Sequence, residues 1–379
     1  MQTSVPSGLR LPHVDVAATF GAAQVERAQR YERFARWDWV LSQVALLVVL
    51  AVYARKGVAF VRESAAGRIG TGMLLGMLGL ALVWLSQLPF GLAQHWWDRR
   101  HDLTNEGYLS WAFSNWGELG AEFLSICLAL LIVMAIAGKL PETWWLPGAL
   151  VFVAIGAAFQ LVLPYIVTAG TKPLRDPELV ADVRADERAQ ELPRIPIRVE
   201  QVSDTTDEAN AFAVGLGPSR RVVIWDTLLD GAYSKAEVNA VLAHELGHHS
   251  SNHLPKGLAW YALFALPGSF LIARATRRRG GMRRAEAVPL GLFVVAALQL
   301  AAMPAQSWIS RGMESEADWK SLQTTHNPQA MRSLFIRFSR DDLGDPNPPT
   351  WAYVLFESHP TLAQRVAMAS AWAARSKSK

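Results

Sequence analysis

Six long stretches of apolar residues with few charges are the feature that most limits how this chain can fold. A helix that crosses the hydrocarbon core of a bilayer needs about 20 such residues, at a rise of about 1.5 Å each. The stretches span residues 39–54, 70–94, 119–138, 144–167, 258–275 and 287–305. One such stretch would also suit a buried core helix, but six in one chain predict a polytopic, mostly α-helical membrane protein.

The composition agrees with insertion into a bilayer. Apolar residues make up 51% of the chain and charged residues 18%, whereas soluble domains carry roughly 25% charged residues. The net charge is +4, but the basic residues gather in short loops beside the apolar stretches, and no nucleic-acid recognition motif accompanies them. We therefore expect a lipid bilayer, and no nucleic acid, as a partner. The single cysteine, Cys127, leaves no internal disulfide and no thiolate metal cluster.

A polar interval between the fourth and fifth stretches divides the chain into two predicted parts. Residues 1–171 form an N-terminal transmembrane bundle, and residues 172–379 form a second module that the hairpin of the last two stretches interrupts. Three strand-like runs predict a small β-sheet in this module: 197–202, 211–216 and 221–225. A helix is expected over 235–249, because Ser234 and Glu237 form a capping box at its start.

The expected helix contains the motif HExxH, with His244, Glu245 and His248. Positions i and i+4 lie on one helix face about one turn apart, so two imidazoles can hold one metal ion. Glu245 can reach a metal-bound water without binding the ion itself, which is the general-base position of a metalloprotease. The motif also occurs as an ordinary pair of surface or core histidines. Its place on a capped helix with an apolar packed face favours the metal site.

A catalytic zinc ion takes three protein ligands and keeps a fourth position open. Glu314 follows the sixth apolar stretch and is the predicted third ligand, which gives one Zn²⁺ per chain. Asp318 stands one helical turn further on the same face, where it can accept the second N–H of a ligand imidazole. Glu316 is a rival for the ligand role, but it points to a different face from Asp318. An isolated Glu314 would otherwise suit a solvated helix position.

The pattern SRxxExxAD, formed by Ser310, Arg311, Glu314 and Asp318 with Ala317, follows HELGH and a hydrophobic hairpin. In this order the motifs resemble the type I CaaX prenyl proteases and their HtpX-type relatives, which are integral membrane zinc metallopeptidases. The resemblance implies a zincin-type catalytic module bearing a small β-sheet. It covers most of the chain, with specific motifs in the second half and diffuse ones before it.

Further motifs carry the resemblance to the substrate site. Residues 210–215 resemble the family's NAxxxG segment, an edge strand that pairs with the substrate backbone. By this correspondence four residues would bind the substrate: Asn210, Ala211, Phe212 and Ala213. His359 and Arg365 match an HPxxxxR motif, and the resemblance implies that they stabilise the oxyanion. Without the resemblance, Asn210 suits an ordinary turn, and the other two suit a helix cap and a surface position.

The resemblance implies hydrolysis of peptide bonds in a peptide or protein substrate, which is prenylated if the chain acts as a prenyl protease. An HtpX-type quality-control protease, which cuts misfolded membrane proteins, is the alternative within the family. A non-catalytic zinc-binding membrane scaffold is the alternative from another class. Two departures concern the substrate: the loop 95–108 lacks an acidic motif of the prenyl proteases, and His249 stands where they have Trp.

Six spans place both termini and the catalytic module on one side of what we expect to be a bacterial inner membrane. The resemblance places that side in the cytosol, and the arginines of an expected amphipathic helix at 22–36 agree. The short loops of the other side carry basic residues within 55–68 and 277–284. Since the positive-inside rule gives short loops the most weight, the sequence leaves both orientations open.

Overall fold

The computed structural model describes residues 4–59, 66–204 and 206–377. Twelve α-helices occur within these ranges: α1 (Val16–Phe20), α2 (Ala22–Lys56), α3 (Gly67–Arg100), α4 (Tyr108–Lys139), α5 (Trp145–Val167), α6 (Pro177–Ala189), α7 (Lys235–Ser250), α8 (His253–Thr276), α9 (Val288–Thr325), α10 (Pro328–Asp341), α11 (Thr350–Leu355) and α12 (Leu362–Lys377). The strands are β1 (Lys172–Pro173), β2 (Ile197–Glu200), β3 (Ala211–Val214) and β4 (Arg221–Trp225).

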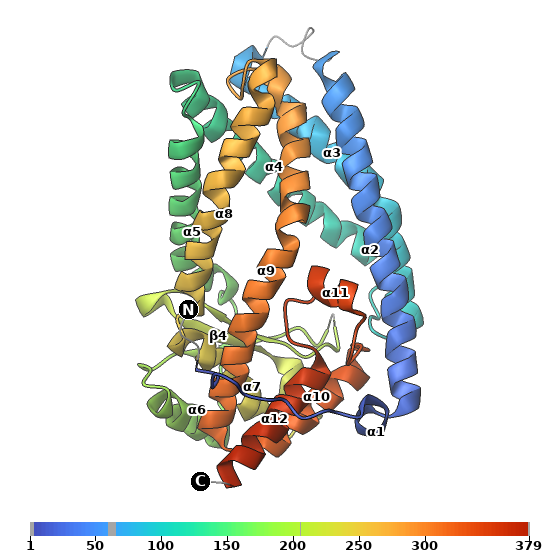
Figure 1. Ribbon diagram of the computed structural model, residues 1–379, viewed down its shortest axis with the longest axis vertical. Coiled ribbons are helices and arrows are strands. Elements are labelled where there is room, and N and C mark those ends of the chain that lie inside the picture. Colours follow the sequence, from blue (N-terminus) through green and yellow to red (C-terminus); the bar gives the residue numbers. More distant parts are fainter. Residues whose placement is uncertain (1–3, 60–65, 205, 378–379) are drawn as a thin grey trace.

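Six of the described helices, α2, α3, α4, α5, α8 and α9, are long and apolar enough to cross a membrane. They fill the upper part of Figure 1, while the sheet and the shorter helices gather at the lower end, where both marked chain ends lie. The prediction of a mostly α-helical, polytopic membrane protein with a small sheet is confirmed.

Helix α2 is longer than the first apolar stretch, because the charged segment ahead of that stretch is part of the same helix. The charged half is held by polar contacts to other elements. The Tyr31 hydroxyl donates to Asp98 of α3 over 2.7 Å, and the buried Arg36 pairs with Asp345 at 3.2 Å. The expected separate amphipathic helix is therefore one continuous rod with the first span.

Close packing of α3 against α4 depends on two glycines one turn apart, Gly72 and Gly76. This spacing is typical of membrane helices whose backbones approach closely. A Cβ atom added at Gly76 would overlap Leu130 of α4, and one at Gly72 would overlap Met134. The two side chains on α4 are almost fully buried against these glycines.

We expect the variant Gly76→Leu to lower the melting temperature of the detergent-purified protein, because overpacking a tight interface costs about 1–3 kcal/mol. Gly268→Leu in α8 is the matched control, since a Cβ at Gly268 has no neighbour within 4 Å. Thermal unfolding of the two variants side by side measures the difference. Equal melting temperatures would contradict the close helix contact.

The sheet has the strand order β1-β2-β4-β3. β2 and β4 are parallel, and the two outer strands pair antiparallel to their neighbours. Val222, Val223 and Ile224 of the central strand β4 are fully buried. β3 is an edge strand, so one side of its backbone lacks a strand partner among the described residues. The two-residue β1 was not predicted, because so short a strand shows no alternating pattern.

The main hydrophobic core joins α7, α9, α10 and α12 to the sheet. Leu242 and Leu246 of α7 have no exposed surface, and the same is true of Leu322 on α9 and Val366 on α12. Phe20, at the end of α1, is also buried against this core. The core therefore fixes α7 relative to α9, which are the two helices that carry the candidate ligands.

Candidate metal centre and active site

Helix α7 begins at the predicted capping box. The Ser234 N–H donates to the Glu237 carboxylate over 2.8 Å, and the Glu237 N–H donates to the Ser234 hydroxyl over 3.3 Å. Further along, α7 meets α9 at Gly247, where an added Cβ would lie 3.2 Å from the Cα and carbonyl oxygen of Ala317. The glycine inside HELGH lets the two helices come close, so the histidines of α7 reach the carboxylate of α9.

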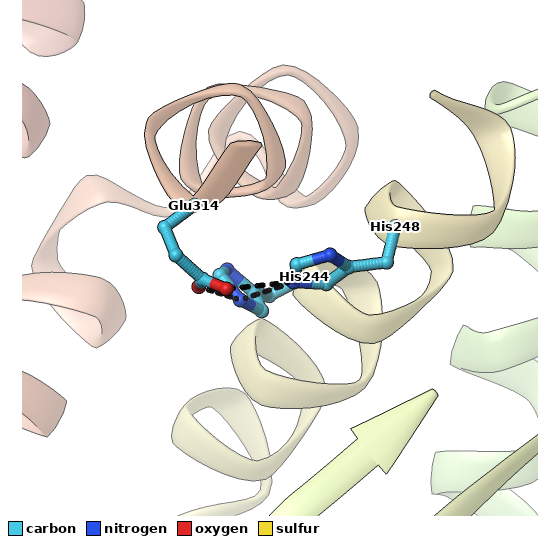
Figure 2. A group of neighbouring side chains, drawn as sticks. All are labelled: His244, His248 and Glu314. Atoms are coloured by element: carbon cyan, nitrogen blue, oxygen red, sulfur yellow. Dashed lines mark hydrogen bonds and ion pairs between the residues drawn. The ribbon is translucent and has the colours of Figure 1, made fainter. Parts of the chain in front are cut away.

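His244 and His248 from α7 and Glu314 from α9 point toward one another, as Figure 2 shows. Their ligand atoms all lie within 4.8 Å of each other, and no other such group of three occurs in the ranges that the structure describes. The two Nε2 atoms are 3.1 Å apart. Glu314 Oε2 lies 3.2 Å from Nε2 of His244, and its Oε1 lies 3.6 Å from Nε2 of His248. Ligands at about 2.0–2.1 Å from one tetrahedral zinc ion are roughly 3.3 Å apart, so the set fits a single ion.

The hydrogen bonds around His244 direct a lone pair toward the centre of this group. Its Nδ1 lies 2.9 Å from Oδ1 of the fully buried Asp318. Because the Nδ1 proton is donated to that carboxylate, Nε2 is left as an acceptor or metal ligand. Asp318 is held in turn by Arg365, which donates through Nε and Nη2 over 2.8 and 2.6 Å. Oε2 of Glu314 is buried, and among the described residues no group forms a hydrogen bond with it.

The electrostatics of the group favour a positive charge at its centre. Burial by itself lowers the pKa of His244, but the carboxylates of Asp318 and Glu314 outweigh it and raise the pKa to about 10. A buried imidazole between two carboxylates thus attracts either a proton or a metal cation. Since the donor atoms are two imidazole nitrogens and a carboxylate, the chemistry suits a divalent metal ion.

Glu245 is buried beside these residues but is not one of the three candidate ligands. Burial raises its pKa, while the two imidazoles and a hydrogen bond from the Ala213 backbone work in the opposite direction. Glu245 lines a cavity of about 120 Å³ whose other lining residues include Asn210, Ala211, His244, His359 and Arg365. The cavity is large enough to hold water, and His244 is the one candidate ligand among its lining residues.

The two residues of the HPxxxxR motif, His359 and Arg365, differ in their exposure and in their contacts. The side chain of His359 is 52% exposed, and its Nε2 lies 3.3 Å from Oε2 of Glu314. Arg365 is largely buried, with its guanidinium bound to Asp318 and stacked 3.9 Å from the Phe335 ring. His359 is therefore half-exposed beside Glu314, whereas Arg365 is buried against Asp318, and both side chains line the same cavity as Glu245.

The four predicted substrate-binding residues lie along and just before the edge strand. Ala211, Phe212 and Ala213 belong to β3, and Asn210 precedes it. The carbonyl of Asn210 accepts a hydrogen bond from the Trp225 N–H over 2.9 Å. Since Asn210 and Ala211 line the same cavity as Glu245, the edge strand and the candidate base share one opening.

Arg311 is a contributor to the site whose role the sequence did not reveal. It lies one turn before Glu314 on α9, and its Nη1 donates to the carbonyls of Tyr353 and Glu357 over 2.8 and 2.7 Å. Its guanidinium also lies 4.4 Å from the centre of the Tyr353 ring. Arg311 thereby ties the ligand helix to the segment that leads into His359. The motif SRxxE was the signal that could have pointed to it.

His253 and Glu316 also contact the site without having been assigned a role there. His253 lies behind His248, with 3.0 Å between their Nδ1 atoms. Its Nε2 is 3.1 Å from Oε2 of Glu316. Glu316, the rival for the ligand role, is therefore outside the ligand group and on the far side of His248.

The structure combines six apolar helices with an HExxH helix, α7, whose histidines face a glutamate of α9. This combination defines an integral membrane metallopeptidase. The model of Peptidase family M48 matches residues 173–373, more than half of the chain. The chain belongs to Peptidase family M48.

Relatives with known names agree with this family. The uncharacterized metalloprotease YhfN of Bacillus subtilis is 23% identical over 96% of this chain and 89% of its own length. A protease HtpX homolog from Acidiphilium cryptum is 28% identical over 58% of this chain and 85% of that protein. A CAAX prenyl protease 1 homolog of Oryza sativa is 27% identical, but the match covers only 43% of this chain and 40% of that protein.

The fold is shared with a solved structure. The crystal structure of S. mikatae Ste24p superposes with a TM-score of 0.79 over 96% of this chain and 92% of that one, at 19% sequence identity. The predicted resemblance to membrane metallopeptidases of the prenyl protease and HtpX type is confirmed.

Proposed function

We propose that this membrane metallopeptidase is a zinc endopeptidase, with His244, His248 and Glu314 as ligands of one zinc ion and Glu245 as the general base. The main support for this proposal is that the ligand atoms of these two histidines and the glutamate all lie within 4.8 Å of one another. Glu245 lies beside them at a cavity that an edge strand also lines. When bound, zinc at such a site lowers the pKa of a water toward about 7 and polarises a carbonyl.

The residues around the ligands have separate roles in this proposal. An extended peptide adds to the free side of β3, along Asn210, Ala211, Phe212 and Ala213, through backbone hydrogen bonds. Glu245 takes a proton from the attacking water and delivers it to the leaving nitrogen. His359, half-exposed beside the ligand group, donates a hydrogen bond to the developing oxyanion. Arg365 holds Asp318 and adds positive charge on that side of the site.

The chain's division and location are proposed on the same basis. We assign residues 1–171 to a membrane bundle and 172–379 to the catalytic module, in the inner membrane of a bacterium. The family match over residues 173–373 supports a catalytic module of about this extent.

The names of the relatives suggest two substrate classes, namely prenylated peptides and proteins handled by HtpX-type proteases. One peptide, prepared with and without a farnesyl group on a cysteine near its carboxyl end, separates them when incubated with detergent-purified protein. A strong requirement for the lipid identifies a prenyl peptidase, and equal cleavage identifies a protease of broader range.

A chelator control completes the cleavage assay. Removal of zinc is expected to stop hydrolysis, and added zinc is expected to restore it. Stoichiometric zinc without chelator-sensitive hydrolysis of either peptide would overturn the proposal and favour a non-catalytic scaffold.

A further inference from the structure

Behind His248, a series of hydrogen bonds between polar side chains leads away from the ligand group. His248 Nδ1 lies 3.0 Å from Nδ1 of His253, and His253 Nε2 lies 3.1 Å from Oε2 of Glu316. The other carboxylate oxygen of Glu316 accepts from the N–H of Ser4 over 2.9 Å and from its hydroxyl over 3.1 Å. This series of hydrogen bonds thus links α7, α8, α9 and the N-terminal segment.

If His248 binds a metal through Nε2, each hydrogen bond in this series can have only one donor and one acceptor. Its Nδ1 must then carry the proton, so Nδ1 of His253 accepts it. His253 consequently carries its own proton on Nε2 and donates it to the Glu316 carboxylate. Each hydrogen bond fixes the tautomer of the next ring, and the carboxylate at the end accepts without needing to donate.

This series of hydrogen bonds is built into the fold, because its two central residues are sequestered from solvent. His253 is 4% exposed and Glu316 is 7% exposed. Lys256 Nζ lies 3.4 Å from Oε2 of Glu316 and compensates its charge. A buried carboxylate with this many donors is held in one position, and it holds the His253 ring in turn.

The N-terminal segment, which contributes Ser4 at the end of this series, is packed onto the catalytic module. It is the dark blue segment that runs across the lower end of the molecule in Figure 1. Val5, Leu9 and Val14 lie against the main core, and Phe20 is buried in it. The segment is therefore anchored by apolar contacts on both sides of the turn at Gly8, which places Ser4 at Glu316.

We propose that His253 and Glu316 are positioning residues that hold the His248 imidazole in its metal-binding tautomer and orientation, and that the N-terminal segment secures them through Ser4. The proposal rests on the metal site put forward above. It gives the two ligand imidazoles different supports: His244 is backed directly by a carboxylate, and His248 is backed by a carboxylate through a second imidazole.

The test is the zinc affinity of the detergent-purified full-length protein, measured by competition with a chromogenic chelator. His253→Leu is expected to weaken zinc binding by about 10–100-fold, the usual cost of losing a residue that orients a metal ligand. His253→Asn keeps an acceptor near the Nδ1 position and is expected to recover part of the loss. Ser4→Pro removes the backbone N–H and is expected to cause a smaller loss, of several-fold.

His249→Leu is the matched control, because His249 is an equally buried neighbour whose Nε2 contacts the Arg221 carbonyl instead of the ligand group. It is expected to retain wild-type zinc affinity even if it lowers the melting temperature of the zinc-free protein. Unchanged affinity in His253→Leu, with zinc still bound by the wild type, would overturn this inference alone. Absence of stoichiometric zinc from the wild type would instead overturn the metal site.

Discussion

Replacing Glu245 with Gln is expected to reduce peptide hydrolysis by about 10²–10⁴-fold, the usual contribution of a positioned general base. Glutamine has the same shape but cannot accept a proton from water. The zinc content should stay at one ion per chain, because Glu245 is not among the three converging ligand groups. Turnover of a peptide and metal analysis of the same detergent-purified samples measure both results.

Glu142→Gln is the control for this prediction. Glu142 is 76% exposed and pairs only loosely with Arg277, at 3.7 Å, far in the fold from the ligand group. It should behave like the wild type in both measurements. If Glu245→Gln kept full zinc and more than a tenth of the wild-type turnover, another group would have to act as the base.

Replacing Asp318 with Leu is expected to damage both the stability of the fold and the affinity for zinc. Asp318 is fully buried, and the substitution leaves the guanidinium of Arg365 without its partner inside the protein. Breaking a buried ion pair in this way costs about 3–5 kcal/mol. His244 also loses the acceptor of its Nδ1 proton, so zinc affinity should fall by about 10–100-fold. Thermal unfolding without zinc and chelator competition measure the two losses separately.

The double variant Asp318→Leu with Arg365→Met distinguishes the two effects. Removing both charges should restore much of the stability, since an apolar pair can replace a buried ion pair at little cost. It should not restore zinc affinity, because His244 still lacks its acceptor. Recovery of wild-type affinity by the double variant would contradict the role of Asp318 in orienting His244.

The local parts of the site could be predicted from the sequence because their geometry follows from helix periodicity. Four-residue spacing puts His244 and His248 on one face of α7, and it does the same for Glu314 and Asp318 on α9. The strand at 221–225 and the helix starting at Lys235 were found at their observed positions, since an apolar run and a capping box mark them.

The remaining parts depend on contacts between segments far apart in the chain, which no local pattern encodes. His253 meets Glu316 only because α8 packs on α9, and Ser4 reaches the same carboxylate across 312 positions of sequence. The contacts of Arg311 likewise require the fold of α11 and of the segment that follows it. The continuity of α2 was missed because its charged half is held by distant partners.

The continuous helix α9 connects a membrane span directly to the candidate metal site. Its first half is one of the apolar spans, and its second half carries Glu314 without an intervening loop. Pro304 lies inside this helix, between the span and Glu314, and a proline at such a position is a usual place for a helix to bend. Bilayer thickness is therefore a quantity to keep constant when zinc affinity and turnover are compared between preparations.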